Sequence, residues 1–178
     1  MARRPLALTV LALLSVACGD LNGKDAKVPG EPLGKFHVVG TMDSSTCGPG
    51  ALGSSDVWEF DVKLSRDGND LYWLNGQEPI YGRIAADGVT FAFDTRVAVP
   101  TVDPSPGYPG CVVVRTDTAS GKLDSATGEV TQFAGLLRFG YTAQAGGDCT
   151  PVVGVEGGFS ALPCEMGYDL AATRTEAP

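Results

Sequence analysis

The feature that most constrains the fold is the alternation of apolar and polar residues within residues 56–97, which is strict at residues 56–65. Four alternating segments follow one another, at residues 56–65, 70–75, 80–85 and 89–97. The stretches between them are rich in Gly, Asp and Asn, which are typical of tight turns. Alternation with a period of two residues predicts an antiparallel meander with one buried face.

The same pattern continues on both sides of this meander. Further strands are expected at residues 36–43, 111–124, 129–143, 152–162 and 168–175, with fraying from residue 173 onward. The Pro-rich stretch PTVDPSPGYPG (100–110) is expected to form an irregular surface loop. The chain should therefore contain nine or ten antiparallel strands, most of them paired with their neighbours in sequence.

An all-β fold in one domain follows from the size and composition of the chain. The 178 residues include 24 Gly and 12 Pro, and no window beyond the N-terminus has a clear helical period. We expect a barrel, because the turns are short and closure removes exposed strand edges; a two-layer sandwich is the alternative. The arrangement loosely resembles lipocalin-like barrels. None of the short lipocalin motifs is present, so this resemblance implies no function.

The N-terminus has the pattern of an export signal. Residues 1–17 contain two arginines, then the apolar run LALTVLALLSVA, and end in a small residue. This apolar run is too short to span a bilayer stably. We therefore expect residues 1–17 to be a signal peptide that is removed on export.

Ser15-Val16-Ala17 precedes Cys18. Leu14 lies four residues before this cysteine, one position earlier than the leucine of the usual cleavage motif. This segment resembles the lipobox of bacterial lipoprotein precursors. The resemblance implies that Cys18 is acylated and becomes the first residue of the mature protein, because several acyl chains give stable membrane anchoring. It also implies that Gly19 favours sorting to the outer membrane.

Residues 18–34 are expected to form the lipidated cysteine and a flexible tether, because the segment lacks aromatic residues and is mostly polar or small. Residues 35–178 form the expected single β domain. These assignments place the protein outside the cytoplasm, in the cell envelope and attached to a membrane.

Four cysteines remain in the β domain, and an exported chain with an even number of cysteines favours disulfides. If the strands run alternately up and down, Cys111 and Cys149 fall at neighbouring strand ends. That leaves Cys47 to pair with Cys164. The rival pairing joins Cys149 to Cys164.

Few residues suggest catalysis or metal binding. His37 is the only histidine and alternates onto the polar face, so a nucleophile with a histidine base is not expected. Glu59 and Asp61 share the outward face of their strand, and paired carboxylates of a hydrolase are a distant alternative. Residues 67–70 contain only a fragment of a calcium loop, which a β-turn explains. We expect no cofactor, no metal and no enzymatic activity.

Eight aromatic residues fall mostly on inward positions. They either fill the barrel or line an apolar pocket, and the sequence does not decide between the two. These residues are Trp58, Phe60, Trp73, Phe91, Phe93, Phe133, Phe139 and Tyr141. Tyr108 lies among prolines, where it could dock a partner or belong to a rigid connector.

The charge of the chain bears on its partners. The formal net charge is −8, and removal of Arg3 and Arg4 with the signal makes it −10. An acidic chain without a basic cluster is not expected to bind nucleic acid. The sequence therefore favours a membrane-anchored binding module for a small apolar ligand or a protein partner. The alternative is a structural or envelope-assembly component without a soluble ligand.

Overall fold

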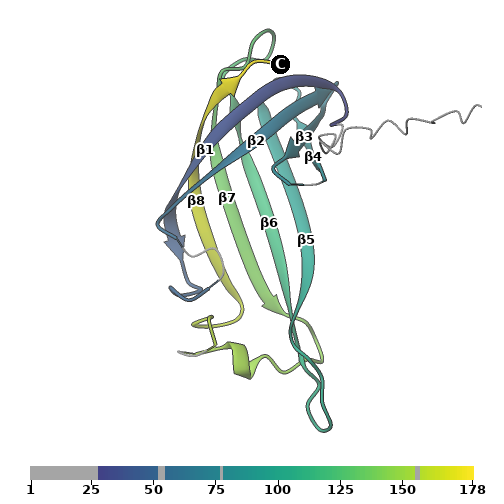
Figure 1. Cartoon of the computed structure of the whole chain (residues 1–178), viewed down its shortest axis with the longest axis vertical. Coiled ribbons are helices and arrows are strands. Elements are labelled where there is room, and N and C mark those ends of the chain that lie inside the picture. Colours follow the sequence, from purple (N-terminus) through teal and green to yellow (C-terminus); the bar gives the residue numbers. More distant parts are fainter. Residues whose placement is uncertain (1–27, 52–54, 77, 155–156) are drawn as a thin grey trace, which may run out of the picture.

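Eight antiparallel strands close into a barrel (Figure 1). We describe it from a computed structural model, which covers residues 28–51, 55–76, 78–154 and 157–178. Each strand pairs with its sequence neighbours, and the last strand pairs with the first. The strands are β1 (Glu31–Ser45), β2 (Val57–Asp67), β3 (Asp70–Leu74), β4 (Ile80–Ile84), β5 (Thr90–Val102), β6 (Cys111–Leu123), β7 (Gln132–Ala143) and β8 (Cys164–Glu176). The predicted meandering barrel is confirmed.

The expected strand at residues 152–162 is wrong, so the expected number of strands was too high. The described part of this segment contains the end of a 3₁₀ helix, η1 (Thr150–Val152), and one isolated bridge between Val153 and Phe159. Gly154 and Gly158 both have positive φ values, 106° and 91°. These glycines turn the backbone away from an extended path, although the valines around them have high strand propensity.

Three strands are longer than expected because a neighbour supplies backbone partners. β1 begins at Glu31, so residues 31–34 belong to the barrel and not to a tether. β5 continues to Val102 and takes the first three residues of the expected Pro-rich loop, since β6 pairs with them. β8 continues to Glu176 and does not fray at Thr173, because β1 and β7 flank it.

Residues 1–27 lie outside the described residues, and with them the expected signal peptide and Cys18. Within the part of the chain that is described, no helix has the length and apolar character needed to cross a membrane.

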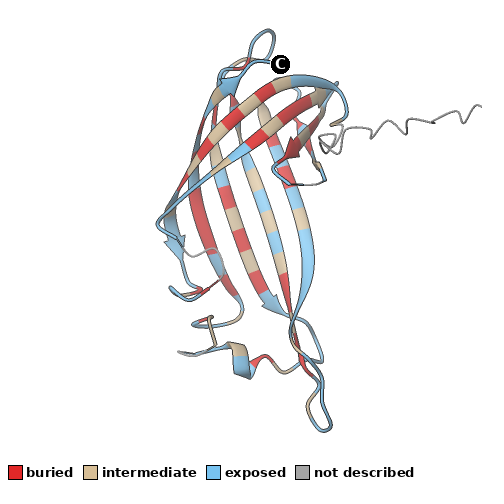
Figure 2. Cartoon of the chain, viewed as in Figure 1, coloured by how far each residue is buried: buried red, intermediate tan, exposed pale blue. Residues whose placement is uncertain are grey.

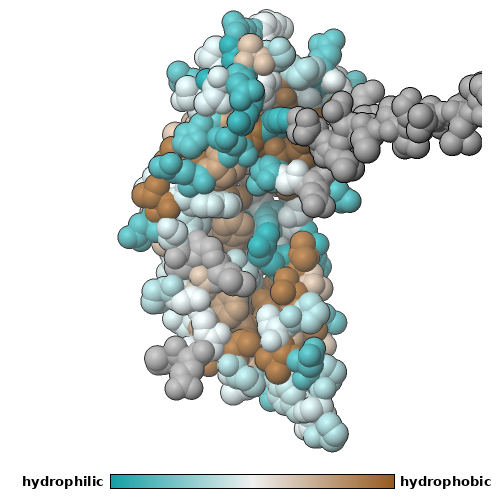
Figure 3. All heavy atoms as spheres, viewed as in Figure 1, coloured by the Kyte–Doolittle hydropathy of each residue, from teal (hydrophilic) through white to brown (hydrophobic). Residues whose placement is uncertain are grey.

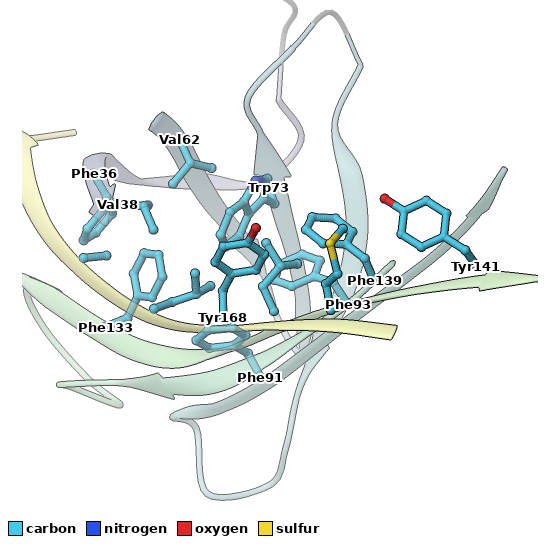
Figure 4. Packing of buried hydrophobic residues seen from close by; sticks show 14 of the residues in the cluster. Phe36, Val38, Val62, Trp73, Phe91, Phe93, Phe133, Phe139, Tyr141 and Tyr168 are labelled. Carbon is cyan, nitrogen blue, oxygen red and sulfur yellow. The ribbon is translucent and has the colours of Figure 1, made fainter. Parts of the chain in front are cut away.

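Aromatic side chains fill the barrel at the end where β1 begins. Burial alternates along the strands, as Figure 2 shows for β7. The ring of Phe133 lies 5.5 Å from that of Phe36, 5.7 Å from that of Phe91 and 5.8 Å from that of Trp73. Gly121 makes room for this cluster, because a Cβ atom there would lie 2.7 Å from the Phe91 ring. Figure 4 shows Phe36, Val38 and Phe133 together at one end of the core.

Both disulfides lie at the opposite end of the barrel. Cys47 bonds to Cys164 and Cys111 bonds to Cys149, as the expected up-and-down strand order predicts. The first bridge joins the loop after β1 to the start of β8, beside the closing strand pair. The second joins the start of β6 to the loop after β7. We call this the disulfide end of the barrel, and the other end the tether end.

The short strands β3 and β4 leave one wall of the barrel incomplete. β2 pairs with β3 only through residues 63–67, and β5 pairs with β4 only through residues 91–93. Within the described residues, positions 57–62 of β2 and 94–102 of β5 therefore have a neighbouring strand on one side only. Figure 1 shows β3 and β4 confined to the half of the barrel near the tether end. We call the part of the wall between β2 and β5 that these strands do not reach, toward the disulfide end, the side opening.

The two disulfides should contribute unequally to stability. The bridged residues are 117 positions apart in one bridge and 38 in the other. Loop-closure entropy then gives about 4.9 kcal/mol for Cys47–Cys164 and about 3.9 kcal/mol for Cys111–Cys149. Replacing Cys47 and Cys164 by Ala should lower the free energy of unfolding by about 1 kcal/mol more than replacing the other pair.

Urea unfolding of the two double variants measures this difference.

Thiol titration of the unfolded, unreduced β domain should find none of these four cysteines free. Two free thiols would contradict the pairing.

Candidate functional site

A cavity of about 170 Å³ lies at the side opening. It is lined by residues of β2 to β7 that point into the barrel, together with Asn75 from the β3–β4 turn. Its apolar lining consists of Trp58, Trp73, Ile80, Phe93, Ala119, Leu137 and Phe139, and its polar lining of Asn75, Thr95, Arg115 and Asp117. Other hollows in the described part of the chain are larger, at about 200 to 470 Å³, but no aromatic side chain lines them. The smaller cavity combines inward-facing aromatic residues with charged groups, so we treat it as the candidate site.

The barrel interior is thus filled at one end and open at the side. The volume is below the 300–1,000 Å³ that is usual for drug-sized ligands. It is close to that of an apolar cavity of about 150 Å³ that holds benzene. The site is therefore large enough for a small ring compound.

Trp58 forms the outer rim of the cavity. Its place in the alternation of β2 directs it into the barrel, yet it remains 37% exposed because no strand covers this part of the wall. Its ring lies 4.6 Å from the Phe60 ring, 6.1 Å from Phe139 and 6.3 Å from Tyr168. Trp58 is thus held by other rings while one side of it faces solvent.

Trp73 and Phe93 form a second group of rings in the cavity wall. Their centres are 5.6 Å apart in an edge-to-face arrangement, and Phe60 lies 5.9 Å from Trp73. Both side chains are almost fully buried. The cavity therefore has a rigid inner wall and a more exposed rim.

Apolar side chains of β5 extend the opening toward the disulfide end. Val97 and Val99 alternate with Phe93 onto the inner face of the barrel, yet they are 48% and 36% exposed. They lie beside Arg115 and Val113 on β6. Figure 3 shows apolar surface on this face of the molecule beside the lower part of β5.

Arg115 and Asp117 form an ion pair inside the barrel. They are two residues apart on β6 and so share its inner face. Arg115 Nη2 donates a hydrogen bond to Asp117 Oδ2 at 2.5 Å, and the guanidinium carbon lies 5.5 Å from the centre of the Phe139 ring. Arg115 Nε and Asp117 Oδ1 are buried and have no hydrogen-bond partner among the described residues. The pair thus uses only part of its hydrogen-bonding capacity.

The environment of this pair changes its electrostatics. Burial raises the pKa of the Asp117 carboxyl above its ordinary value, and the hydrogen bond from Arg115 opposes this increase. Burial also raises the pKa of the nearby Tyr141 hydroxyl. The cavity thus holds one positive and one negative charge that compensate each other, and Asp117 is the less exposed of the two, at 18% against 40% for Arg115.

The predicted aromatic residues divide into four groups. Trp58, Trp73, Phe93 and Phe139 line the cavity. Phe60 packs between the two tryptophans, and Phe91 and Phe133 belong to the filled core at the tether end. Tyr141 is buried at the disulfide end, where the centre of its ring lies 5.2 Å from that of Phe159. Figure 4 shows Tyr141 on the right, at the opposite end of the core from Phe36.

Sequence reasoning missed Arg115 and Asp117 as lining residues. The signal was present, because Val113, Arg115, Asp117 and Ala119 occupy alternate positions of one predicted strand. The two charges were overlooked because charged residues on a strand usually face solvent.

The other polar candidates lie on the outer surface. His37 Nδ1 is 3.1 Å from Asp61 Oδ1, and His37 Nε2 is 3.6 Å from Glu59 Oε2. Hydrogen bonds from His37 and Lys35 lower the pKa of Asp61. These residues form an exposed charge cluster across β1 and β2.

Residues 67–70 form the β2–β3 turn, with Gly68 at a positive φ of 61°. Asp70 accepts a hydrogen bond from the Tyr81 hydroxyl at 2.8 Å. In the described parts of the chain, no group of three or more His, Cys, Asp or Glu side chains is placed to hold a metal ion.

Tyr108 belongs to a connector between loops. Its backbone pairs with Ser105, and its hydroxyl donates a hydrogen bond to the backbone oxygen of Asp148. The Pro-rich loop is thereby tied to the loop after β7. This contact favours the rigid connector over a docking role for Tyr108.

No family model matches the chain, and neither a curated protein nor a solved structure matches it. The function is therefore argued from the geometry of the cavity.

Removing one member of the ion pair should cost more than removing both. In the variant Arg115→Leu, Asp117 stays buried without its partner, and we expect a loss of about 1–3 kcal/mol in the free energy of unfolding. The double variant Arg115→Leu/Asp117→Leu should lose less, because an apolar pair of similar volume leaves no buried charge.

The single variant should also respond to pH. Asp117 has a raised pKa in the folded state, and loss of Arg115 raises it further. The folded state then binds a proton more readily than the unfolded state, so the variant should lose stability as the pH rises above the ordinary value of 3.8. Urea unfolding from pH 4 to 7 measures this, with the double variant as control. An equal loss in both variants at pH 7 would contradict the interpretation.

Proposed function

We propose that this chain is an exported, lipid-anchored binding module that holds a small ligand with an apolar body in the side cavity of its barrel. The observation that carries this proposal is the side opening, where β3 and β4 are too short to complete the wall. The partly exposed Trp58 and the buried rings of Trp73, Phe93 and Phe139 line the resulting cavity. Ligand sites of this kind are concave and mostly apolar, with a few polar groups that fix orientation.

The proposed role is binding without catalysis. Asp117 is the only carboxylate among the described residues that line the cavity, and it is engaged by Arg115. A hydrolase of the two-carboxylate type needs a second acid within about 5–10 Å of the first. His37 lies on the outer face, away from the cavity.

The anchoring part of the proposal fits the position of the opening. Acylation of Cys18 would place the membrane on the N-terminal side of β1, and β1 begins at the tether end. Residues 18–30 would span at most about 43 Å at roughly 3.3 Å per residue. The side opening lies toward the disulfide end, so the tether would attach at the other end of the barrel and leave the opening uncovered.

Native mass spectrometry of the chain purified from an exporting host tests the binding role. We expect a small molecule that leaves on denaturation. The variant Ala119→Phe should abolish its retention, because Ala119 lines the cavity and a phenyl ring would fill the space.

The matched control is Ala92→Phe, since Ala92 is an exposed residue of β5. This variant should retain the molecule. If no small molecule is retained and added apolar compounds do not bind, the alternative of a structural envelope component or a protein-binding module gains support instead.

Replacement of Cys18 by Ser tests the lipid anchor. The variant cannot carry the acyl chains, so membrane affinity should fall and the protein should move to the soluble fraction. Membrane fractionation with metabolic labelling by a fatty acid measures both effects. Continued membrane association of Cys18→Ser would contradict the proposed anchor.

A further inference from the structure

The size of the cavity limits the ligand to a small ring compound. The volume of about 170 Å³ slightly exceeds that of the apolar cavity of about 150 Å³ that holds benzene. A long acyl chain could not extend toward the tether end, because the ring cluster of Phe36, Phe91 and Phe133 closes that end of the barrel.

The walls of the cavity favour a flat ligand. Trp58 and Phe139 lie on one side, with ring centres 6.1 Å apart, and Trp73 and Phe93 are 5.6 Å apart in a second group. All four rings line the cavity. Aromatic rings gain most from other flat rings in offset or edge-to-face contact.

The polar groups in the cavity require both an acceptor and a donor on the ligand. Arg115 can only donate hydrogen bonds, and an ionised Asp117 can only accept them. Their mutual bond joins Nη2 to Oδ2, and the side chains of Arg115 and Asp117 remain 40% and 18% exposed, so part of each can still meet a ligand in the cavity that they line. Because the two side chains are in contact, the groups that complement them must be adjacent on the ligand as well.

The charge balance of the cavity favours a neutral ligand. The +1 charge of Arg115 is already compensated by Asp117, which is only 18% exposed. A charged ligand would lose part of its hydration among the aromatic rings without finding a free counter-charge, and that desolvation is costly.

We propose that the ligand is a neutral, planar ring compound that carries a hydrogen-bond acceptor next to a donor on one edge. Lactams and ring amides have this edge. The ring lies among Trp58, Trp73, Phe93 and Phe139, and its polar edge faces Arg115 and Asp117. This inference rests on the proposed binding function and specifies its ligand class.

The two tryptophans provide a direct readout of binding. They are the only tryptophans of the chain, and both line the cavity. The indole N–H signals of the ¹⁵N-labelled chain can be followed by NMR during titration with 2-pyridone, 1-methyl-2-pyridone, benzene, benzoate and benzylammonium. 2-Pyridone carries the adjacent acceptor and donor, while its N-methyl derivative keeps the acceptor and lacks the donor.

We expect 2-pyridone to shift both indole signals and to bind about tenfold or more tightly than benzene, through two added hydrogen bonds. 1-Methyl-2-pyridone should lose most of this gain. In the variant Arg115→Leu/Asp117→Leu, 2-pyridone should bind no better than benzene. The comparison of the two pyridones needs no variant, so it tests the inference even if the double variant does not fold.

Equal binding of benzene and both pyridones would overturn the polar-edge inference and leave the proposed binding function intact. Tighter binding of benzoate or benzylammonium would overturn the neutrality of the ligand. If no compound shifts either indole signal, the inference and the binding function in this cavity both fail.

Discussion

The pairing of β1 with β8 is the interaction on which the rest of the structure depends. It joins the two ends of the sheet, from Lys35 with Glu176 to Ser45 with Met166. Without it, the sheet would have two free edges, and the aromatic side chains of its inner face would lack an enclosed space. The Cys47–Cys164 bridge lies directly beyond this ladder and holds its disulfide end together.

The barrel wall is complete at the tether end and incomplete at one side. This difference decides which inward side chains belong to the buried core and which line the candidate site. Where β3 and β4 complete the wall, Phe91 and Phe133 are almost fully buried. Where they do not reach, Trp58 and Val97 keep inward positions but remain partly exposed. Strand length thus decides whether an inward apolar residue becomes core or lining.

Local patterns predicted most of the fold. Alternation located all eight strands and the barrel class, and the order of strand ends placed Cys111 near Cys149. The segment at residues 152–162 was misjudged because valine propensity and glycine turns conflict there. The side opening could not be predicted, because it depends on how far β2 and β5 extend beyond their short neighbours. Arg115 and Asp117 were missed for the related reason that an inward charge makes sense only beside an open cavity.

The position of the Cys47–Cys164 bridge has a mechanical consequence for a chain held at its N-terminus. A load applied there would reach β1 first at Glu31 and tend to peel it from β2 and β8. At Cys47 the load no longer follows the chain alone, because the disulfide couples the end of β1 covalently to the start of β8. The bridge therefore passes tension from the first strand directly to the last and shields the residues between the two cysteines from it.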